Sequence, residues 1–286
     1  MSSLPTPDLD TRIPRIKGTR RSQLKGDRRP SAHRWPLGLV LPVVLTLLWE
    51  LLARVGILAP NLMPAPTVVL ATIVDLAVRG ELWQHIGITL YRVLLGFLIG
   101  GSAATVLGAL TGYFPKVRRI LDPTLQALRN IPSIAWVPLF ILWLGIYEPS
   151  KIALIAVGVF FPIYLNLMTG IQQVDRKLVE VGRVYRLSQW QLIWRVFLPA
   201  TLPSYLVGLR GGLGLGWMFV VAAELMGASR GLGFLLVDGQ TTGRPAIIIA
   251  SIILFAILGK LTDSALAVLT HHLLSWQDTH GSEKSS

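Results

Sequence analysis

Long apolar segments are the feature that most constrains this chain. Six of them, each of about 20 residues or more, fall at residues 37–55, 86–113, 125–144, 152–171, 202–226 and 246–269. A helix needs about 20 apolar residues to cross a hydrocarbon core about 30 Å thick. With 52% hydrophobic and 15% charged residues, and a mean hydropathy of +0.57, the composition does not suit a soluble domain of 286 residues. We expect an all-α polytopic membrane protein with about six transmembrane helices.

The third segment, residues 125–144, is interrupted by polar residues and prolines. They are Arg129, Asn130, Pro132 and Pro138. A kinked spanning helix and a re-entrant segment both fit this pattern. If the segment did not span, the last three spans would reverse their orientation.

Basic residues are distributed unevenly between the segments. Residues 1–34 hold nine: Arg12, Arg15, Lys17, Arg20, Arg21, Lys25, Arg28, Arg29 and Arg34. With six spans, Lys116, Arg118, Arg119, Arg176, Lys177, Arg183, Arg186 and Arg195 fall on the same side as this arm, and Arg79, Lys151, Arg230 and Arg244 on the other. Because Lys and Arg gather in cytoplasmic loops, we expect both termini in the cytoplasm and a disordered arm. The same rule explains the net charge of +12 without a nucleic-acid partner.

Small residues recur every four positions in two of the segments. The second segment carries Gly96, Gly100, Ala104, Gly108 and Gly112, and the fifth carries Gly208, Gly212 and Gly216. At about 3.6 residues per turn they form flat stripes that another helix can approach closely. The partner is either another helix of the same chain or a second subunit.

A polar, helix-patterned hairpin lies between the fourth and fifth segments, at residues 175–199. Asp175 is placed to cap a first helix, and Ser188 with Gln191 forms a capping box for a second helix that Pro199 is expected to end. The two apolar stripes are Val174, Leu178, Val181 and Tyr185, then Trp190, Ile193, Trp194, Phe197 and Leu198. The hairpin is suited to contact another protein, or to rest on lipid headgroups through its tryptophans.

At this hairpin the sequence resembles the permease subunits of binding-protein-dependent ABC importers. Their signature, E-A-A, three residues, G, nine residues, I-x-L-P, reads here as Glu180-Val181-Gly182, then Arg186, then Val196-Phe197-Leu198-Pro199. The resemblance implies that the hairpin docks on an ATP-binding subunit through Glu180, Gly182, Arg183, Arg186, Leu187, Ser188 and Pro199. Arg186 replaces the glycine of the motif, which implies either strain in a left-handed turn or a turn displaced by a residue.

Further landmarks resemble the nitrate, sulfonate and bicarbonate branch of that family, and most of all the aliphatic sulfonate permeases. They include Leu62-Met63-Pro64-Ala65-Pro66, Arg129-Asn130-Ile131-Pro132, Phe161-Pro162-Ile163-Tyr164, Gly231-Leu232-Gly233 and Leu258-Gly259-Lys260-Leu261-Thr262-Asp263. Taurine, nitrate, bicarbonate and thiamine-precursor permeases are close siblings. The implied domains are an arm at 1–34, a permease domain at 35–276 and a polar tail at 277–286.

The resemblance also implies the assembly and its place in the cell. Two copies, expected to be identical, would combine with two cytoplasmic ATP-binding subunits and an extracytoplasmic solute-binding protein in the inner membrane of a bacterium. The chain itself would be no enzyme and would hold no cofactor or metal. No phosphate-binding loop is present in the sequence, which agrees with ATP hydrolysis by a separate subunit.

Ionisable residues inside the spans are candidates for the translocation path. Arg92 and Arg210 either present positive charge to an anion or pair with Glu50, Glu224 or backbone carbonyls. Glu224 either shapes an outer gate or has a structural hydrogen-bonding role.

The interrupted third segment supplies further candidates for the path. Asn130, Trp136 and Trp143 qualify because discontinuous helices expose backbone groups to solutes. Trp136 and Trp143, seven residues apart, would share one helical face, so packing or an interfacial belt explains them as well.

Two other classes of protein remain as alternatives. A secondary transporter driven by an ion gradient would need paired carboxylates in the membrane, for which Glu50 and Glu224 are the candidates. A membrane-embedded enzyme would need clustered catalytic groups such as H-E-x-x-H, and the sequence has none. His271 and His272 are adjacent, so they point to different sides of a helix and do not form a metal pair.

Overall fold

The computed structural model describes residues 37–274, and all regular secondary structure in that range is helical. The chain divides into two units, residues 1–44 and 45–286. Of the first unit, only the beginning of α1 (Leu37–Arg54) lies among the described residues. The predicted all-α class is confirmed. The predicted arm, 1–34, and tail, 277–286, lie outside the described residues.

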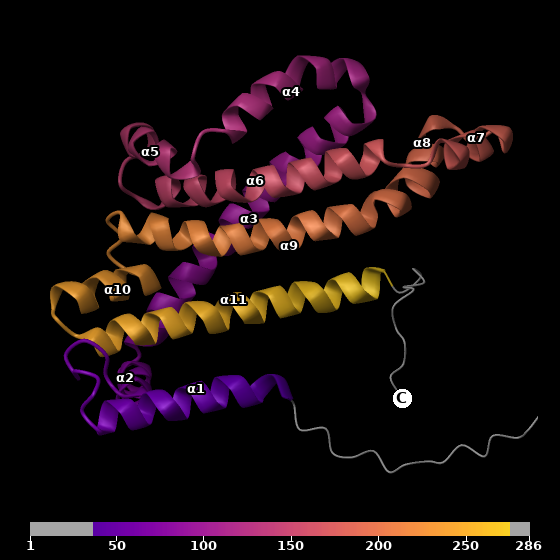
Figure 1. Cartoon of the computed structure of the whole chain (residues 1–286). Coiled ribbons are helices and arrows are strands. Elements are labelled where there is room, and N and C mark those ends of the chain that lie inside the picture. Colours follow the sequence, from indigo (N-terminus) through magenta and orange to yellow (C-terminus); the bar gives the residue numbers. More distant parts are fainter. Residues whose placement is uncertain (1–36, 275–286) are drawn as a thin grey trace, which may run out of the picture. The chain divides into compact units, whose positions relative to one another are not determined.

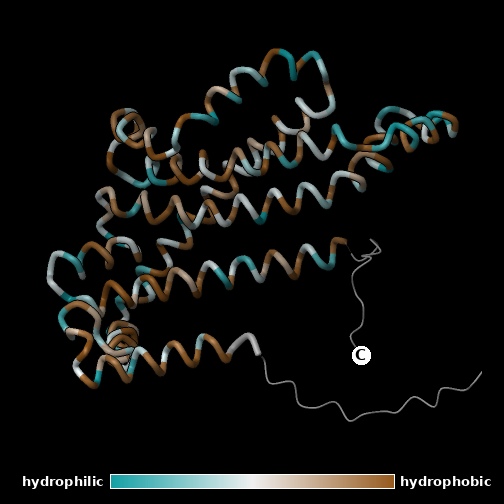
Figure 2. Tube along the Cα trace, viewed as in Figure 1, coloured by the Kyte–Doolittle hydropathy of each residue, from teal (hydrophilic) through white to brown (hydrophobic). Residues whose placement is uncertain are grey.

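Four long helices dominate the second unit: α3 (Glu81–Tyr113), α6 (Glu148–Gln172), α9 (Leu198–Leu225) and α11 (Pro245–Leu273). α6, α9 and α11 lie side by side, and α3 crosses them (Figure 1). Each of the four is long and apolar enough to cross a membrane. Figure 2 shows hydrophobic residues along α6, α9 and α11, and hydrophilic residues gathered in the hairpin that joins α6 to α9.

α6 is the central helix of the core. Its side chains Ile155, Val159 and Ile163 are completely buried. A Cβ on Gly96 would lie 2.7 Å from the Cβ of Ile155, and one on Gly212 would lie 2.8 Å from a side-chain carbon of Ile163. Both glycine stripes therefore face α6, and the prediction that they are packing faces is confirmed, with the partner in the same chain.

The third predicted span is not a single helix. α4 (Pro115–Arg129) ends at Arg129, and after Pro132 the chain forms a short 3-10 turn, η1 (Ser133–Trp136), and α5 (Val137–Leu144). The two halves meet at 92°, as in a broken span or a re-entrant loop. A proline disfavours helical backbone in the residue before it, which explains the break. The expected interruption is confirmed, and a kinked spanning segment and a re-entrant segment both remain compatible with it.

The described residues contain four candidate spans, or five if the bent pair counts as one. The first predicted span corresponds to α1, an 18-residue helix. A total of six spans therefore stays a prediction. The sequence patterns missed two short helices, α2 (Pro66–Val78) and α10 (Leu232–Thr241).

The hairpin differs from the prediction at its second helix. α7 (Arg176–Val184) is separate, but α8 (Gln189–Leu192) continues through a π-helical turn, η2 (Ile193–Phe197), directly into α9. The whole helix runs over 37 residues, Gln189–Leu225. The expectation that Pro199 ends a helix is wrong, because the wider π turn directly before it replaces the α-helical hydrogen-bond pattern that its missing N–H and its ring would otherwise disrupt.

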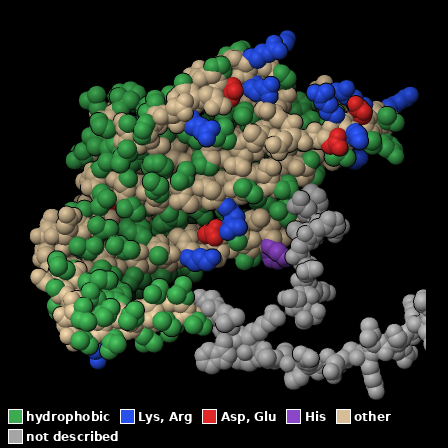
Figure 3. Space-filling model, in the orientation of Figure 1, with side chains coloured by type: hydrophobic (Ala, Val, Ile, Leu, Met, Phe, Trp, Pro, Cys, Tyr) green, Lys and Arg blue, Asp and Glu red, His purple; other side chains and the backbone are tan. Residues whose placement is uncertain are grey.

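The two ends of the long helices differ in charge. α4 begins beside the hairpin, where the ring of Tyr113 lies 5.2 Å from that of Phe197. The basic groups predicted to be cytoplasmic, at the start of α4 and in the hairpin, therefore lie at the same end, and Figure 3 shows Lys and Arg gathered over the hairpin. α2, α5 and α10 lie at the opposite end (Figure 1). His271 and His272 occupy the last turn of α11.

The close contact between α3 and α6 predicts a stability difference between two glycines of one helix. A Cβ on Gly100 would strike the backbone of Ala156, whereas a Cβ on Gly87 meets nothing within 4 Å. We expect Gly100→Ala to destabilise the protein by about 1–3 kcal/mol, and Gly87→Ala to be neutral or to stabilise it by up to about 1 kcal/mol. Thermal unfolding of the two variants in detergent measures the difference, and equal shifts would contradict the packing role of Gly100.

Candidate functional site

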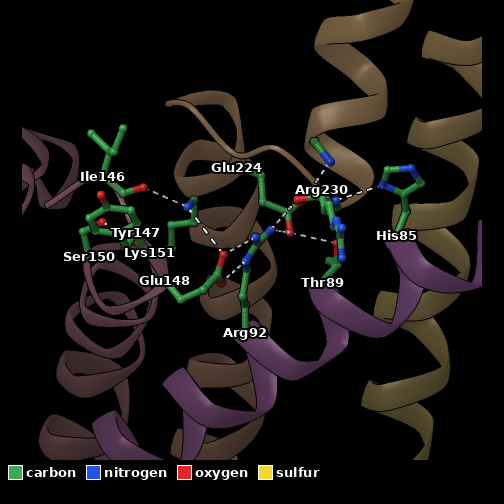
Figure 4. Close-up of polar contacts among 12 residues, drawn as sticks. His85, Thr89, Arg92, Ile146, Tyr147, Glu148, Ser150, Lys151, Glu224 and Arg230 are labelled. Atoms are coloured by element: carbon green, nitrogen blue, oxygen red, sulfur yellow. Dashed lines mark hydrogen bonds and ion pairs between the residues drawn. The ribbon is translucent and has the colours of Figure 1, made fainter.

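Arg92 lies at the centre of a buried polar network (Figure 4). Glu148 begins α6 and Glu224 lies next to the end of α9, so the network is near the end of the helices opposite the hairpin. Its side chain is 1% exposed. Nε and Nη2 donate to the two carboxylate oxygens of Glu148, each over 2.7 Å, and Nη1 donates to Glu224 over 2.7 Å and to the carbonyl of Arg230 over 2.8 Å. Lys151 lies 3.6 Å from Glu148. The ion-paired groups are thus two cations and two carboxylates.

Glu224 is held on every side by hydrogen-bond donors. One carboxylate oxygen accepts from Arg92 and from the hydroxyl of Thr89, and the other accepts from the backbone N–H of Gly233 over 2.7 Å. A Cβ on Gly231 would lie 2.5 Å from the carboxyl carbon of Glu224. Gly231 also has a φ of 123°, which favours glycine. The loop before α10 therefore closes over the carboxylate because it lacks side chains at these positions.

The network joins three long helices and one loop. Thr89 and Arg92 come from α3, Glu148 from α6 and Glu224 from α9, while Leu232 begins α10 and donates its N–H to Thr89. Buried charges are stable only when they are paired and hydrogen-bonded, and here each is. The predicted pairing of Arg92 with Glu224 and with a backbone carbonyl is confirmed. Because two carboxylates compensate its charge and its side chain is buried, Arg92 is not available to bind a solute anion.

Sequence reasoning missed several members of this network, among them Thr89, Glu148 and His85. Glu148 begins α6, four residues before the predicted fourth span, so it had the pattern of a loop residue. His85 likewise lies before the predicted second span, and its Nδ1 accepts from the N–H of Gly231 over 3.0 Å. The position of Glu148 beside Arg92 depends on how α3 and α6 meet, which periodicity along one helix does not encode. His85 instead lies two turns before Arg92 on the same face of α3.

At the other end, the hairpin has the two caps expected from its sequence. The carboxylate of Asp175 accepts from the N–H of Lys177 over 2.9 Å. Ser188 and Gln191 exchange hydrogen bonds in a complete capping box. Both expectations are confirmed.

Arg186 is in the left-handed conformation, with a φ of 53°. The N–H of Arg186 donates to Arg183 and that of Leu187 donates to Gly182, which is the hydrogen-bond pattern of a Schellman turn. Of the two expected outcomes, the turn is therefore not displaced, and the arginine adopts a backbone conformation that glycine would adopt without cost. Gly182 is buried against Leu192 and Leu187.

The hairpin exposes large apolar side chains as well as charge. Val184, Tyr185, Trp190 and Trp194 are each more than 60% exposed. Glu180, Arg183, Arg186 and Ser188 are exposed too, whereas Leu187 and Pro199 are partly buried. Of the seven residues assigned to a partner contact, four are thus accessible on the hairpin surface.

Comparison with known proteins identifies the family. Residues 96–274 match the model of the binding-protein-dependent transport system inner membrane components. The chain belongs to this family. The permease is 42% identical to an aliphatic sulfonates transport permease protein, SsuC, of Bacillus subtilis (strain 168), over 88% of this chain and 92% of the relative. Its counterpart of the same name in Escherichia coli (strain K12) is also 42% identical, over 84% and 91%.

More distant relatives agree with this assignment. The taurine transport system permease protein TauC of Escherichia coli (strain K12) is 34% identical, over 85% of this chain and 92% of the relative. A chain of the MetNI methionine ABC transporter in an inward-facing conformation matches with a TM-score of 0.55 at 22% identity, over 69% of the permease and 96% of that chain. The structural match shows the fold of an ABC transporter permease. The relatives are transport permeases, and the apolar helices agree with a multi-pass membrane protein.

The other ionisable candidates of the permease lie apart from the network. Arg210 pairs with Asp263 of α11, through Nε to Oδ1 at 3.0 Å and Nη2 to Oδ2 at 2.9 Å. Glu50 accepts from Arg54 over 2.6 Å and from Thr67. The expected pairing of Arg210 with Glu50, Glu224 or a backbone carbonyl is therefore wrong, because its partner is Asp263, an acid within the predicted sixth span.

The candidates on the broken segment have different surroundings. Asn130 is exposed just after α4. Trp136 lies in η1, stacked on Phe140 at 6.0 Å, and Trp143 lies in α5 with 65% exposure. Trp136 ends η1 and α5 begins at the next residue, so of the two tryptophans only Trp143 lies within the α-helix, and a common helical face stays a prediction.

The network predicts unequal effects for its two carboxylates. Glu224 is completely buried, whereas the side chain of Glu148 is 41% exposed. Glu224→Gln removes the charge that compensates Arg92 and turns an amide toward the N–H of Gly233. We therefore expect the free energy of unfolding to fall by about 3 kcal/mol. Glu148→Gln should lower the free energy of unfolding by only about 1 kcal/mol, because water can reach this partly exposed position and solvate the groups that lose the carboxylate. Thermal unfolding in detergent compares them, and a larger loss for Glu148→Gln would contradict this account.

The left-handed turn predicts that a glycine improves the hairpin. We expect Arg186→Gly to stabilise the protein by about 1 kcal/mol, because the Cβ penalty at a φ of 53° disappears. Arg183→Gly removes the same charge from within α7 and serves as the control. We expect it to destabilise the protein by about 1 kcal/mol. Limited proteolysis of the hairpin measures both. Faster cleavage of Arg186→Gly than of the parent protein would refute the strained turn.

Proposed function

We propose that this permease is the membrane subunit of an ABC importer for a small organic anion, with an aliphatic sulfonate as the first candidate. The observation that supports a sulfonate as the transported solute is the 42% identity, over nearly full length, to sulfonate permeases from two different bacteria. Taurine, nitrate, bicarbonate or a thiamine precursor are the alternatives within the same type of importer. A taurine permease at 34% and a nitrate import permease at 32% identity are more distant than the sulfonate permeases.

The proposed partners are two cytoplasmic ATP-binding subunits, an extracytoplasmic solute-binding protein and a second, identical copy of the permease. The family name itself points to a binding protein. The exposed apolar and charged surface of the hairpin supports a protein contact at that end, because solvent alone does not favour the exposure of Tyr185 and Trp190. We place the hairpin and both termini in the cytoplasm, in line with the basic residues at that end.

The helix that leaves the hairpin supports a mechanical role. Since α8, η2 and α9 form one helix of 37 residues, its length is about 55 Å at 1.5 Å per residue. It carries Trp190 and Trp194 at one end and Glu224, bound to Arg92, near the other. A displacement of the hairpin by closing ATP-binding subunits would thus reach the buried network at the far end. In this proposal Arg92 and Glu224 position the outer part of the path, and Asn130, Trp136 and Arg210 contribute to its wall.

The proposed function predicts ATP-dependent uptake that needs the hairpin. Proteoliposomes that contain the permease, its ATP-binding subunits and the solute-binding protein should accumulate ethanesulfonate only with ATP. Glu180→Lys, which reverses an exposed charge of α7, should abolish both uptake and solute-stimulated ATP hydrolysis while membrane insertion stays intact. Asp75→Lys, on the exposed surface of α2 at the opposite end, is the matched control and should leave both activities unchanged.

The same vesicles distinguish the alternatives. Uptake without nucleotide that collapses when an ion gradient is removed would replace the importer with a secondary transporter. Competition by taurine or nitrate, in excess over ethanesulfonate, would reassign the cargo within the family. Normal stimulation in Glu180→Lys would show that α7 does not contact the ATP-binding subunit.

A further inference from the structure

An ion pair is exposed on the surface of α9 and α11, at a depth where such pairs are costly. Arg210 is the thirteenth of the 28 residues of α9, so about 18 Å of helix lies on one side and about 22 Å on the other. The Arg210 and Asp263 side chains are 45% and 33% exposed. Figure 3 shows Lys, Arg and acidic side chains side by side over α9 and α11.

Lipid is an unsuitable environment for this surface. Charged side chains at the centre of a bilayer face other protein or a water-filled path. In transporters the solute sites lie near this depth. The surface that carries Arg210 therefore borders an aqueous path or a second polypeptide.

The group carries an excess of positive charge, unlike the network around Arg92. Lys260, one turn before Asp263 on α11, is exposed and acts electrostatically on it, and it has no ion pair among the described residues. The group thus has two cations and one carboxylate. Arg210 uses Nε and Nη2 for Asp263, and its Nη1 has no acceptor within the described part of the chain. A guanidinium has five N–H donors, so three remain available.

The surface beside Arg210 is also open. A Cβ on Gly214, one turn further along α9, would meet nothing within 4 Å, and one on Gly211 would meet only Pro162, at 3.9 Å. These glycines differ from Gly208, Gly212 and Gly216, which face α6. The face of α9 beside the free donors is therefore not covered by the rest of the described chain.

We propose that Arg210 and Lys260 form the anion-recognition site of the translocation path, with Asp263 as an internal competitor. This inference rests on the proposed function. A sulfonate group presents oxygens that match the guanidinium fork, and Lys260 adds a second charge. The solute takes the free donors of Nη1 first and then replaces the carboxylate of Asp263. When the solute leaves, Asp263 pairs with Arg210 again, which keeps the site from holding the anion too tightly for transport.

Binding of ethanesulfonate to the purified complex of permease and ATP-binding subunits, without the solute-binding protein, tests this site directly. Asp263→Asn removes the competitor and should tighten binding at least threefold. The double variant Arg210→Met with Asp263→Leu removes the pair without leaving an isolated charge, so the complex should still assemble and hydrolyse ATP. It should no longer bind ethanesulfonate, and its rate of uptake should fall at least tenfold. Arg79→Met with Asp75→Leu, an exposed pair on α2, is the matched control and should change neither.

The outcomes separate this inference from the proposed function. If the parent complex takes up ethanesulfonate and the Arg210–Asp263 double variant binds and transports it equally well, the pair is only structural and the site is overturned. If the double variant does not assemble, Lys260→Gln decides, because this exposed side chain has no ion pair with any described residue: binding weakened about threefold supports the site, and unchanged binding overturns it. Failure of the parent complex to transport any sulfonate would instead refute the cargo.

Discussion

Contact between backbones at the surface of α6 holds this permease together. Lipid tails are as apolar as leucine, so burial of apolar side chains does not drive helices together in a membrane, and close packing must do so. Gly96 and Gly100 of α3 approach the chain of α6 at Ile155 and Ala156, and Gly212 and Gly216 of α9 approach it at Ile163 and Val159. The positions of α3 and α9 follow from these contacts. So does the place where Arg92 of α3 meets Glu224 of α9.

The charges inside the helices fall into two groups with different surroundings. Around Arg92 the ion-paired cations and carboxylates balance, Arg92 and Glu224 are buried, and the loop before α10 covers them through its glycines. Around Arg210 the pair is half-exposed and Lys260 leaves an excess of positive charge. Low-dielectric surroundings make the first group rigid, since each partner left alone would be costly. The second group is accessible, which suits a site that must bind and release.

The long helix from Gln189 to Leu225 links the two ends of the molecule. It begins in the capped hairpin and passes Arg210 on the way to Glu224. Because a π turn precedes Pro199, the helix continues where a proline would otherwise kink or end it. Force applied at the hairpin would thus act on the accessible charge group and on the rigid one through a single element.

The sequence alone determined the helical class, the caps at Asp175 and Ser188, and the glycine stripes, because each depends on residues less than about two turns apart. It also determined the family, through motifs spread along the chain. Only the tertiary structure decided which charges meet. Glu148 lies 56 residues from Arg92 and Asp263 lies 53 residues from Arg210. No periodicity within one helix encodes such a distance, because it is set by how closely the helices pack and by the angle at which they cross.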